Sequence, residues 1–413
     1  MLPAGDEDLG SGDVTEIVVA ELEYHPGHLL GRSHAVHRNP GDVGDHLRMD
    51  DATGSVGPVK TISAAADKPL WPQIAGNPDG GAIVVSQRTR GLDAHPRGFD
   101  SRVEARRISA KGRLGPVKTV SAKGRPAGGP RIASDAHGNA IVTWEQKRAT
   151  LRIKARRISA KGALGHVQTL SSAKRKSEDP VIASDARGDA IAAWSQPDSS
   201  DWRIRARQIS AKGRLGPVRT LSAPGHGAGL AQVASDARGD AVVVWSQFDS
   251  KESTRTIKAR RISAKGTVGR VMTLSSAQEY GLLPQVASDA RGDTVVVWEG
   301  DGAEARQISP TGVLGPTQTL SSPGQAGYSP QVGIDDAGNA TTLWFDADFS
   351  SHPNRWDLQA RQISATGALR PTQTLASKPI RNTAIAVNAE GDAYAAWTQF
   401  NGSNWSEWGS QGP

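Results

Sequence analysis

Apolar, β-branched residues along this chain gather in short runs that recur at regular intervals. Representative runs are Gln232–Ser235, Ala241–Trp245 and Ile257–Ser263, which are four to seven residues long. Gly, Pro, Asp and Ser bound each run, and this combination is typical of short β-strands rather than of helices. The pattern therefore predicts an all-β chain.

One phrase recurs seven times. It reads Pro-Arg-Ile-Ala-Ser-Asp-Ala-His-Gly-Asn-Ala-Ile-Val-Thr-Trp at 130–144 and is closely repeated at 284–298. The turn glycines of the seven copies are Gly80, Gly138, Gly188, Gly239, Gly292, Gly338 and Gly391. A repeat of about fifty residues indicates a repeat architecture such as a propeller.

Each repeat predicts four strands. After the two strands of the first phrase, a third strand such as Ile257–Ser263 and a fourth such as Pro116–Val120 complete the unit. Asp-Ala-Arg-Gly and Ser-Ala-Lys-Gly join the pairs, and a glycine at the fourth turn position favours a type I turn followed by a residue with positive φ. The fourth strand often begins with Pro, so we expect it at a sheet edge.

The ends of the chain are complementary. The last copy supplies only the first two strands, at about 383–399, and an orphan fourth strand, 57–62, precedes the first copy. Four-stranded antiparallel units of this length are propeller blades. The sequence therefore predicts a seven-bladed β-propeller whose ring is closed by N-terminal strand(s) that complete the C-terminal blade.

Two residue types recur inside the repeat. A tryptophan ends the second strand in six blades: Trp144, Trp194, Trp245, Trp298, Trp344 and Trp397. We expect these rings to pack between neighbouring sheets, the alternative being a ring of sugar-stacking platforms. An arginine recurs in the third strand, at Arg106, Arg156, Arg207, Arg260, Arg306 and Arg361, where we expect pairing with carboxylates of the same blade.

Composition and charge divide the chain. The 413 residues include no Cys, which excludes disulfides and Cys-ligated metals. The first 50 residues carry 3 basic and 10 acidic side chains, and the remainder carries 46 basic and 32 acidic ones, a net charge of +14. We predict a propeller over 48–413 and a poorly ordered or non-native tail over 1–47. We expect an extracellular or cell-surface protein, although the start of the sequence has no signal-peptide pattern.

The repeat resembles bacterial seven-bladed β-propeller repeat proteins over about 51–413. Its Ser-Asp…Gly…Trp phrase is also remotely similar to the Asp-box of sialidase-like propellers, with Gly three positions after Asp and Trp six positions after Gly. The sialidase catalytic set of three arginines, a tyrosine and a glutamate has no counterpart that we can assign. The resemblance therefore implies an architecture and no particular activity.

Topology separates two faces. The loops between strands one and two and between strands three and four emerge on one side, here called the constant face, because their sequences hardly vary. The other two loops of each blade emerge on the variable face, where ligand-binding residues are expected. The candidate ligand-binding residues are Arg90, Asp93, His95, Asp198, Trp202, Tyr280, Tyr328, Asp346, Asp348 and Trp356.

The functional prediction is a non-catalytic binding or interaction scaffold with carbohydrate as the leading ligand class. The alternatives are a glycan-active enzyme, such as a sialidase-like hydrolase or a lyase, and a structural surface protein without a small-molecule ligand. We predict no cofactor, no metal site, no catalytic residue and a monomer. Nucleic acid is not expected as a partner, because the basic residues recur around the ring without a stacking-aromatic motif.

Overall fold

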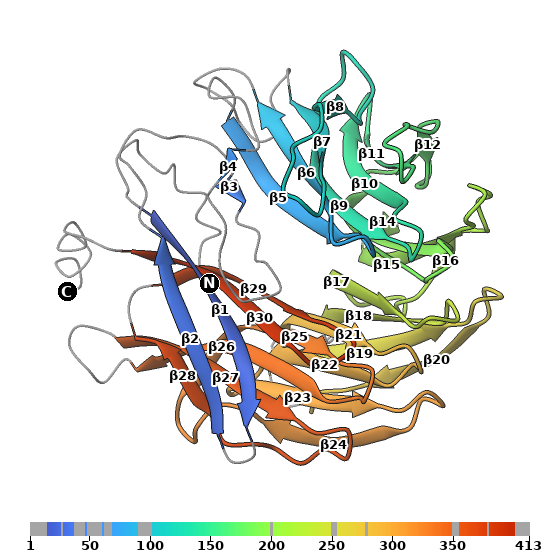
Figure 1. Ribbon diagram of the computed structural model, residues 1–413. Coiled ribbons are helices and arrows are strands. Elements are labelled where there is room, and N and C mark those ends of the chain that lie inside the picture. Colours follow the sequence, from blue (N-terminus) through green and yellow to red (C-terminus); the bar gives the residue numbers. More distant parts are fainter. Residues whose placement is uncertain are drawn as a thin grey trace, which may run out of the picture.

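The computed structural model describes residues 15–25, 28–36, 46–47, 60–61, 68–89, 101–198, 201–248, 254–276, 280–348, 355–377 and 380–400. Their regular elements are all β-strands, which form seven antiparallel sheets of four strands and one sheet of two. Figure 1 shows the larger sheets arranged as a fan around a common centre. The predicted seven-bladed, all-β architecture is confirmed. The described part of the chain contains no helix long and apolar enough to cross a membrane.

Six blades follow one another along the chain. Blade 1 contains β5 (Lys68–Gly76), β6 (Ala82–Thr89), β7 (Arg102–Ile108) and β8 (Lys118–Thr119). Blade 2 contains β9 (Ala127–Ser134), β10 (Ala140–Lys147), β11 (Leu151–Ile158) and β12 (Gln168–Thr169). Blade 3 contains β13 (Glu178–Ser184), β14 (Ala190–Asp198), β15 (Asp201–Ile209) and β16 (Arg219–Thr220).

Blades 4 to 6 repeat this order. Blade 4 contains β17 (Ala228–Ser235), β18 (Ala241–Phe248), β19 (Arg255–Ile262) and β20 (Val268–Thr273). Blade 5 contains β21 (Leu282–Ser288), β22 (Thr294–Glu299), β23 (Ala303–Ile308) and β24 (Leu314–Thr319). Blade 6 contains β25 (Ala326–Ile334), β26 (Ala340–Asp348), β27 (Arg355–Ile363) and β28 (Gln373–Ala376).

The first strand of each blade lies innermost. Contacts between consecutive blades run from β5 to β9 and on through β13, β17, β21 and β25 to β29 (Ile380–Val387). The fourth strand lies at the opposite end of the strand order in blades 1 to 6. The predicted edge position of this strand is therefore confirmed.

Blade 7 joins the two halves of the chain. Its order is β2 (His28–Val36), β1 (Thr15–His25), β30 (Ala393–Phe400) and β29, so N-terminal strands do complete the C-terminal blade. The strands differ from those expected, because β4 (Lys60–Thr61) of the predicted strand 57–62 pairs with β3 (His46–Leu47) instead.

The choice of partner has a physical reason. β1 pairs with β30 from Thr15 opposite Phe400 to Leu22 opposite Ala393, a ladder that satisfies many backbone groups of a long strand edge. Strands β1 and β2 of the expected tail therefore belong to a blade. Closure of the ring between blades 7 and 1, and the domain boundary at residue 48, stay predictions.

The recurrent tryptophans form the core between blades. All six side chains are at most 2% exposed, and each contacts apolar residues of a neighbouring or the same blade. Their expected packing role is confirmed, and burial excludes the alternative of six sugar-stacking platforms. In blade 1, Ser86 stands in place of the tryptophan.

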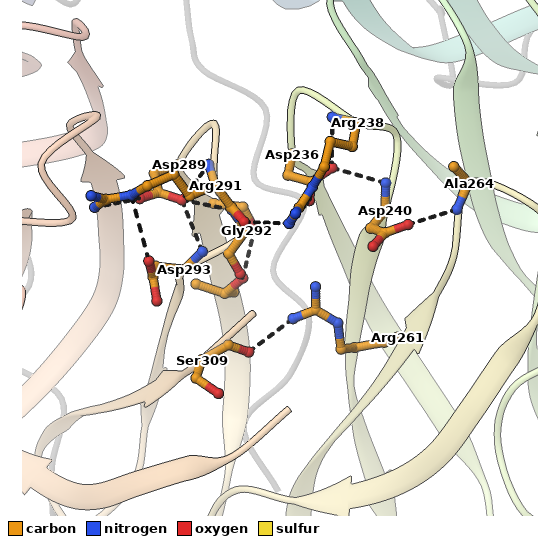
Figure 2. A network of polar contacts seen from close by, with 12 residues as sticks. Asp236, Arg238, Asp240, Arg261, Ala264, Asp289, Arg291, Gly292, Asp293 and Ser309 are labelled. Carbon is orange, nitrogen blue, oxygen red and sulfur yellow. Dashed lines mark hydrogen bonds and ion pairs between the residues drawn. The ribbon is translucent and has the colours of Figure 1, made fainter. Parts of the chain in front are cut away.

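The turns of the constant face form a relay from blade to blade (Figure 2). The buried carboxylate of Asp236 accepts hydrogen bonds from the backbone N–H groups of Arg238 and Asp240, each at 2.9 Å. Arg238 in turn donates to the carbonyl oxygen of Arg291 in the next blade, at 2.5 Å. Gly292 has a φ of +97°, as the predicted turn requires.

Five of the recurrent third-strand arginines form no ion pair with a carboxylate of the described residues, contrary to our expectation: Arg156, Arg207, Arg260, Arg306 and Arg361. Arg260 donates through Nε to the carbonyl oxygen of Gly269 (2.6 Å) and through Nη1 to that of Leu221 in the preceding blade (2.9 Å). The same two carbonyl positions accept from Arg156, Arg207, Arg306 and Arg361. The expectation was wrong because a guanidinium can serve two orphan backbone acceptors at once, and this joins adjacent blades.

Candidate functional site

One pair of predicted residues that the structure brings together lies on the variable face of blade 6. Tyr328 lies near the start of β25, and Trp356 lies near the start of β27. Their ring centroids are 5.7 Å apart and their planes are inclined by 42°. Both rings are half-buried and pack against the apolar cluster around Phe345 and Leu358. A rigid aromatic pair with polar edges therefore borders this part of the face.

Asp346 lies on the same strand β26, but its side chain points to the other face of the sheet, because Tyr328 and Trp356 pair with its neighbours Phe345 and Ala347. Asp346 is only 4% exposed, and its carboxylate accepts a hydrogen bond from the indole N–H of Trp344 at 2.7 Å. Asp346 is also directly opposite Asp357 across the β26–β27 ladder. Burial raises the pKa of Asp346 to about 6; the neighbouring Asp357 acts in the same direction, whereas the Trp344 hydrogen bond opposes it.

An ionisable group is unusual at this position of the repeat. In blades 2, 3 and 4 the residue two after the tryptophan is Gln146, Gln196 or Gln247, and its Oε1 accepts the indole N–H. Asp346 keeps the acceptor and adds a titratable carboxyl group. Blade 6 therefore differs from blades 2, 3 and 4 in having a buried acid at this position.

Asp198 and Trp202 lie together on blade 3. The Asp198 carboxylate faces three guanidinium groups, those of Arg205 at 3.1 Å, Arg175 at 3.7 Å and Arg203 at 3.9 Å. The ammonium group of Lys176 lies 5.8 Å from the centroid of the Trp202 ring. Positive charge therefore exceeds negative charge around this carboxylate.

Tyr280 belongs to a third cluster, between blades 4 and 5. The Arg255 guanidinium carbon lies 4.0 Å from the Phe248 ring centroid and 5.2 Å from that of Tyr280. Both rings are more than 40% exposed. Sequence reasoning missed Phe248 and Arg255, although their positions at the two ends of a variable loop were a usable signal.

The remaining candidates are not brought into a cluster. Arg90, Asp93 and His95 lie outside the described residues, and for Asp348 only the backbone position at the end of β26 is described. The candidates therefore divide among separate blades of the variable face, and their role in binding stays a prediction.

A further set of positions was missed altogether. Each innermost strand of blades 1 to 6 contains one residue with a φ between +44° and +56°, near the end that leads to the variable face. We call these residues the axial positions: Trp71, Gly129, Asp179, Leu230, Leu283 and Ser329. Trp71 is 47% exposed, and the ladder shifts register at this residue. Non-glycine residues rarely adopt this conformation, so the fold must hold them there.

Side chains of the preceding blade hold several axial positions. The carboxylate of Glu145 accepts the Asp179 N–H at 2.8 Å, and that of Glu299 accepts the Ser329 N–H at 2.6 Å. Burial raises the pKa of Glu299, and the Ser329 hydrogen bond opposes this shift. Both acids directly follow the core tryptophan of their blade, which is the sequence signal that could have identified the axial positions.

Comparisons with known proteins show the fold. No family model and no curated protein matches this chain. Among solved structures, a lectin from Burkholderia pseudomallei has a TM-score of 0.53 and 13% identity, over 82% of this chain and 98% of that chain.

Two further likenesses are weaker. The Hadza microbial sialidase has a TM-score of 0.43 and 13% identity over 82% of this chain and 88% of its own. A polysaccharide lyase described as an ulvan lyase has a TM-score of 0.47 and 11% identity over 74% of this chain and 83% of its own. The chain is therefore a seven-bladed β-propeller, and its fold is remotely similar to that of the Burkholderia pseudomallei lectin.

Proposed function

We propose that the variable face binds carbohydrate without chemical conversion, and that the Tyr328–Trp356 pair of blade 6 is the principal contact. The observation that supports this most is the aromatic pair itself, whose half-buried rings have centroids 5.7 Å apart at the start of β25 and β27. Sugar rings present apolar C–H faces and polar edges. A site for them combines aromatic surface with a few placed polar groups.

The remaining parts of the prediction agree with this role. We propose a location outside the cell or at its surface, with a monomer as the binding unit. The lectin likeness concerns the fold, and the ligand of that lectin is not transferred to this chain.

The test is a glycan array followed by calorimetry on the full chain. We expect Trp356→Ala to abolish binding of the glycan selected on the array. Trp356→Phe keeps an aromatic face and should retain part of the affinity. Phe248→Ala is the matched control, because it removes an exposed ring of the same face from blade 4. Thermal unfolding verifies that each variant folds. No binding on the array, or equal loss in the Phe248 variant, would refute the proposal.

A second candidate function is supported by one specific observation. Asp346 and Asp357 lie opposite each other, and the pKa of Asp346 is raised to about 6. A carboxyl group with a raised pKa beside a second carboxyl group is the kind of pair that glycan hydrolysis by general acid–base chemistry uses. A glycosidase and lyase screen decides between the two functions: turnover that Asp346→Asn removes while leaving the protein folded would favour the enzyme.

A further inference from the structure

Positive charge is concentrated on one sector of the variable face. Three segments contain no acidic residue: 120–126, which leads into blade 2, 147–154, which spans the end of β10, the connecting loop and the first half of β11, and 170–177, which leads into blade 3. They contain nine cations: Lys123, Arg125, Lys147, Arg148, Arg152, Lys154, Lys174, Arg175 and Lys176. We call these three segments the basic loops. All of their cations except Arg152 and Lys154 are exposed.

Hydrogen bonds hold the basic loops side by side. Gln146 donates to the carbonyl oxygens of Ala122 (3.4 Å) and Arg125 (3.2 Å), which attaches the first loop to β10. Arg152 of β11 donates to the carbonyl oxygen of Ala173 at 3.2 Å, which attaches the segment 170–177 to this strand. The nine cations therefore belong to one continuous surface.

The charges on this surface are poorly compensated. Burial lowers the pKa of Lys154, and Arg152, Arg125 and Arg148 lower it further, with no carboxylate acting against them. In the segment 170–177, Lys176 pairs with Glu178 at 2.6 Å, and Arg175 lies 3.7 Å from the carboxylate of Asp198. Asp198 is already shared with two more arginines. Like charges held together are destabilising, and an anionic ligand would relieve this repulsion.

Three other interblade segments of the variable face lack this feature. The segments after β16, β20 and β24, which lead into blades 4, 5 and 6, contain no lysine or arginine. The lysines of the constant face, such as Lys111, Lys161 and Lys212, occur one per turn. The sector on blades 2 and 3 is therefore not a consequence of the repeat or of a uniformly basic surface.

We propose that the basic loops bind an anionic polysaccharide through its sulfate or carboxylate groups. Arginine recognises both groups through paired N–H donors, and closely spaced loops can follow the repeating charges of a polymer. The basic loops contain no aromatic residue, and Trp202 beside Lys176 is one ring rather than a row on which successive nucleobases could stack, which favours a glycan over single-stranded nucleic acid. The inference goes beyond the proposed function, because this surface shares no residue with the Tyr328–Trp356 pair.

The test measures binding of the full chain to heparin, polygalacturonate, neutral dextran and duplex DNA at several salt concentrations. Heparin supplies sulfate groups and polygalacturonate supplies carboxylates, so their relative affinities identify the preferred anion. We expect binding to at least one of the two, weakening as salt rises, and no binding to dextran. The variant Lys123→Glu/Arg125→Glu/Arg148→Glu should bind about tenfold more weakly or worse, because three contacting charges are reversed.

The control changes net charge equally on the other face. Lys111→Glu/Lys161→Glu/Lys212→Glu should keep its affinity for the polysaccharide within about twofold, because distant exposed charges are screened. Lys174→Gln/Arg175→Gln/Lys176→Gln gives an independent weakening should the first variant not fold. Trp356→Ala should bind the anionic probe as the native chain does, which separates this site from the proposed one. Equal losses in the control, DNA binding as tight as that of heparin, or no binding to either polysaccharide would overturn the proposal.

Discussion

Trp344 donates its indole N–H to a carboxylate oxygen of Asp346, at 2.7 Å, in a blade position where other blades use a glutamine amide. The indole N–H would be satisfied equally well by a neutral acceptor. The carboxylate in blade 6 therefore adds a buried negative charge that the core does not need. Burying this charge costs free energy, so the pKa of the carboxyl group rises. Carboxyl groups with raised pKa values are also typical of functional sites.

The first prediction concerns pH. Because the pKa of Asp346 is raised to about 6, the native state holds this proton more tightly than the unfolded chain. The free energy of unfolding should therefore fall as pH rises from about 4 to about 6, by about 1–3 kcal/mol. Asp346→Asn keeps an acceptor for Trp344 and should remove this part of the dependence, which urea denaturation across the pH range would measure.

A second acid provides the control for this prediction. Burial also raises the pKa of Glu299, so this residue should likewise lower the unfolding free energy as pH rises. Its part of the pH dependence should persist in the Asp346→Asn variant. Glu299→Gln should remove the remainder. A native chain whose stability rises through this pH window would contradict the assignment.

The repeat made most of the fold predictable, and the reasons are local. The Asp-x-x-Gly turns specify hairpins because Gly239 and Gly292 adopt positive φ, and an apolar ring such as Trp245 must be buried. The partner of β30 was not predictable in the same way. Residues 15–22 repeat none of the phrases, and pairing between chain ends is decided by competition among distant edges.

The site was less predictable, because its determinants are invisible in residue type. Backbone carbonyls occur at every position, so nothing in the sequence indicated that Arg260 would donate to Leu221 rather than to a carboxylate. The exposed Trp71 stood outside the repeated phrase, and its positive φ follows from the register shift in β5. Tyr328, Asp346 and Trp356 were found because variable loops on one face meet in space.

The arginine clamp gives the second prediction. Arg260→Ala leaves the carbonyl oxygens of Gly269 and Leu221 without their guanidinium donor and should cost about 1–3 kcal/mol of unfolding free energy. Arg260→Lys keeps the charge but offers one donor group, so it should recover less than half of the loss. Arg214→Ala, in an exposed turn, is the control and should stay within about 0.5 kcal/mol. Equal losses at Arg214 and Arg260 would show that the clamp contributes nothing specific.

The third prediction separates two buried tryptophans. Trp245 donates to Gln247 at 2.9 Å, whereas the Trp298 indole N–H has no hydrogen-bond partner among the described residues. Replacement by Phe creates a similar cavity at both positions, because both side chains are fully buried. Trp245→Phe also leaves a buried amide oxygen unpaired. It should therefore lower the unfolding free energy by about 1 kcal/mol more than Trp298→Phe, as chemical denaturation would measure. Equal costs would mean that the indole hydrogen bond is energetically neutral.

The last prediction tests the strain at the axial positions. Trp71 has a φ of +51°, where any Cβ costs about 1 kcal/mol and glycine costs nothing. In an ordinary strand position, alanine is instead more stable than glycine by about 0.5–1 kcal/mol, because glycine has more conformational freedom to lose. The stability advantage of alanine over glycine should therefore disappear or reverse at residue 71, so that Trp71→Gly is at least as stable as Trp71→Ala.

Ile74 is the matched control, because it lies in the same strand β5, is 54% exposed, and is not among the described residues with positive φ. Ile74→Gly should be less stable than Ile74→Ala by about 0.5–1 kcal/mol, which is the normal difference. Thermal and urea unfolding of the four variants measures both differences in one background. If the Ala–Gly difference were the same at residues 71 and 74, the left-handed conformation would carry no cost, and the axial ring would not be a store of strain.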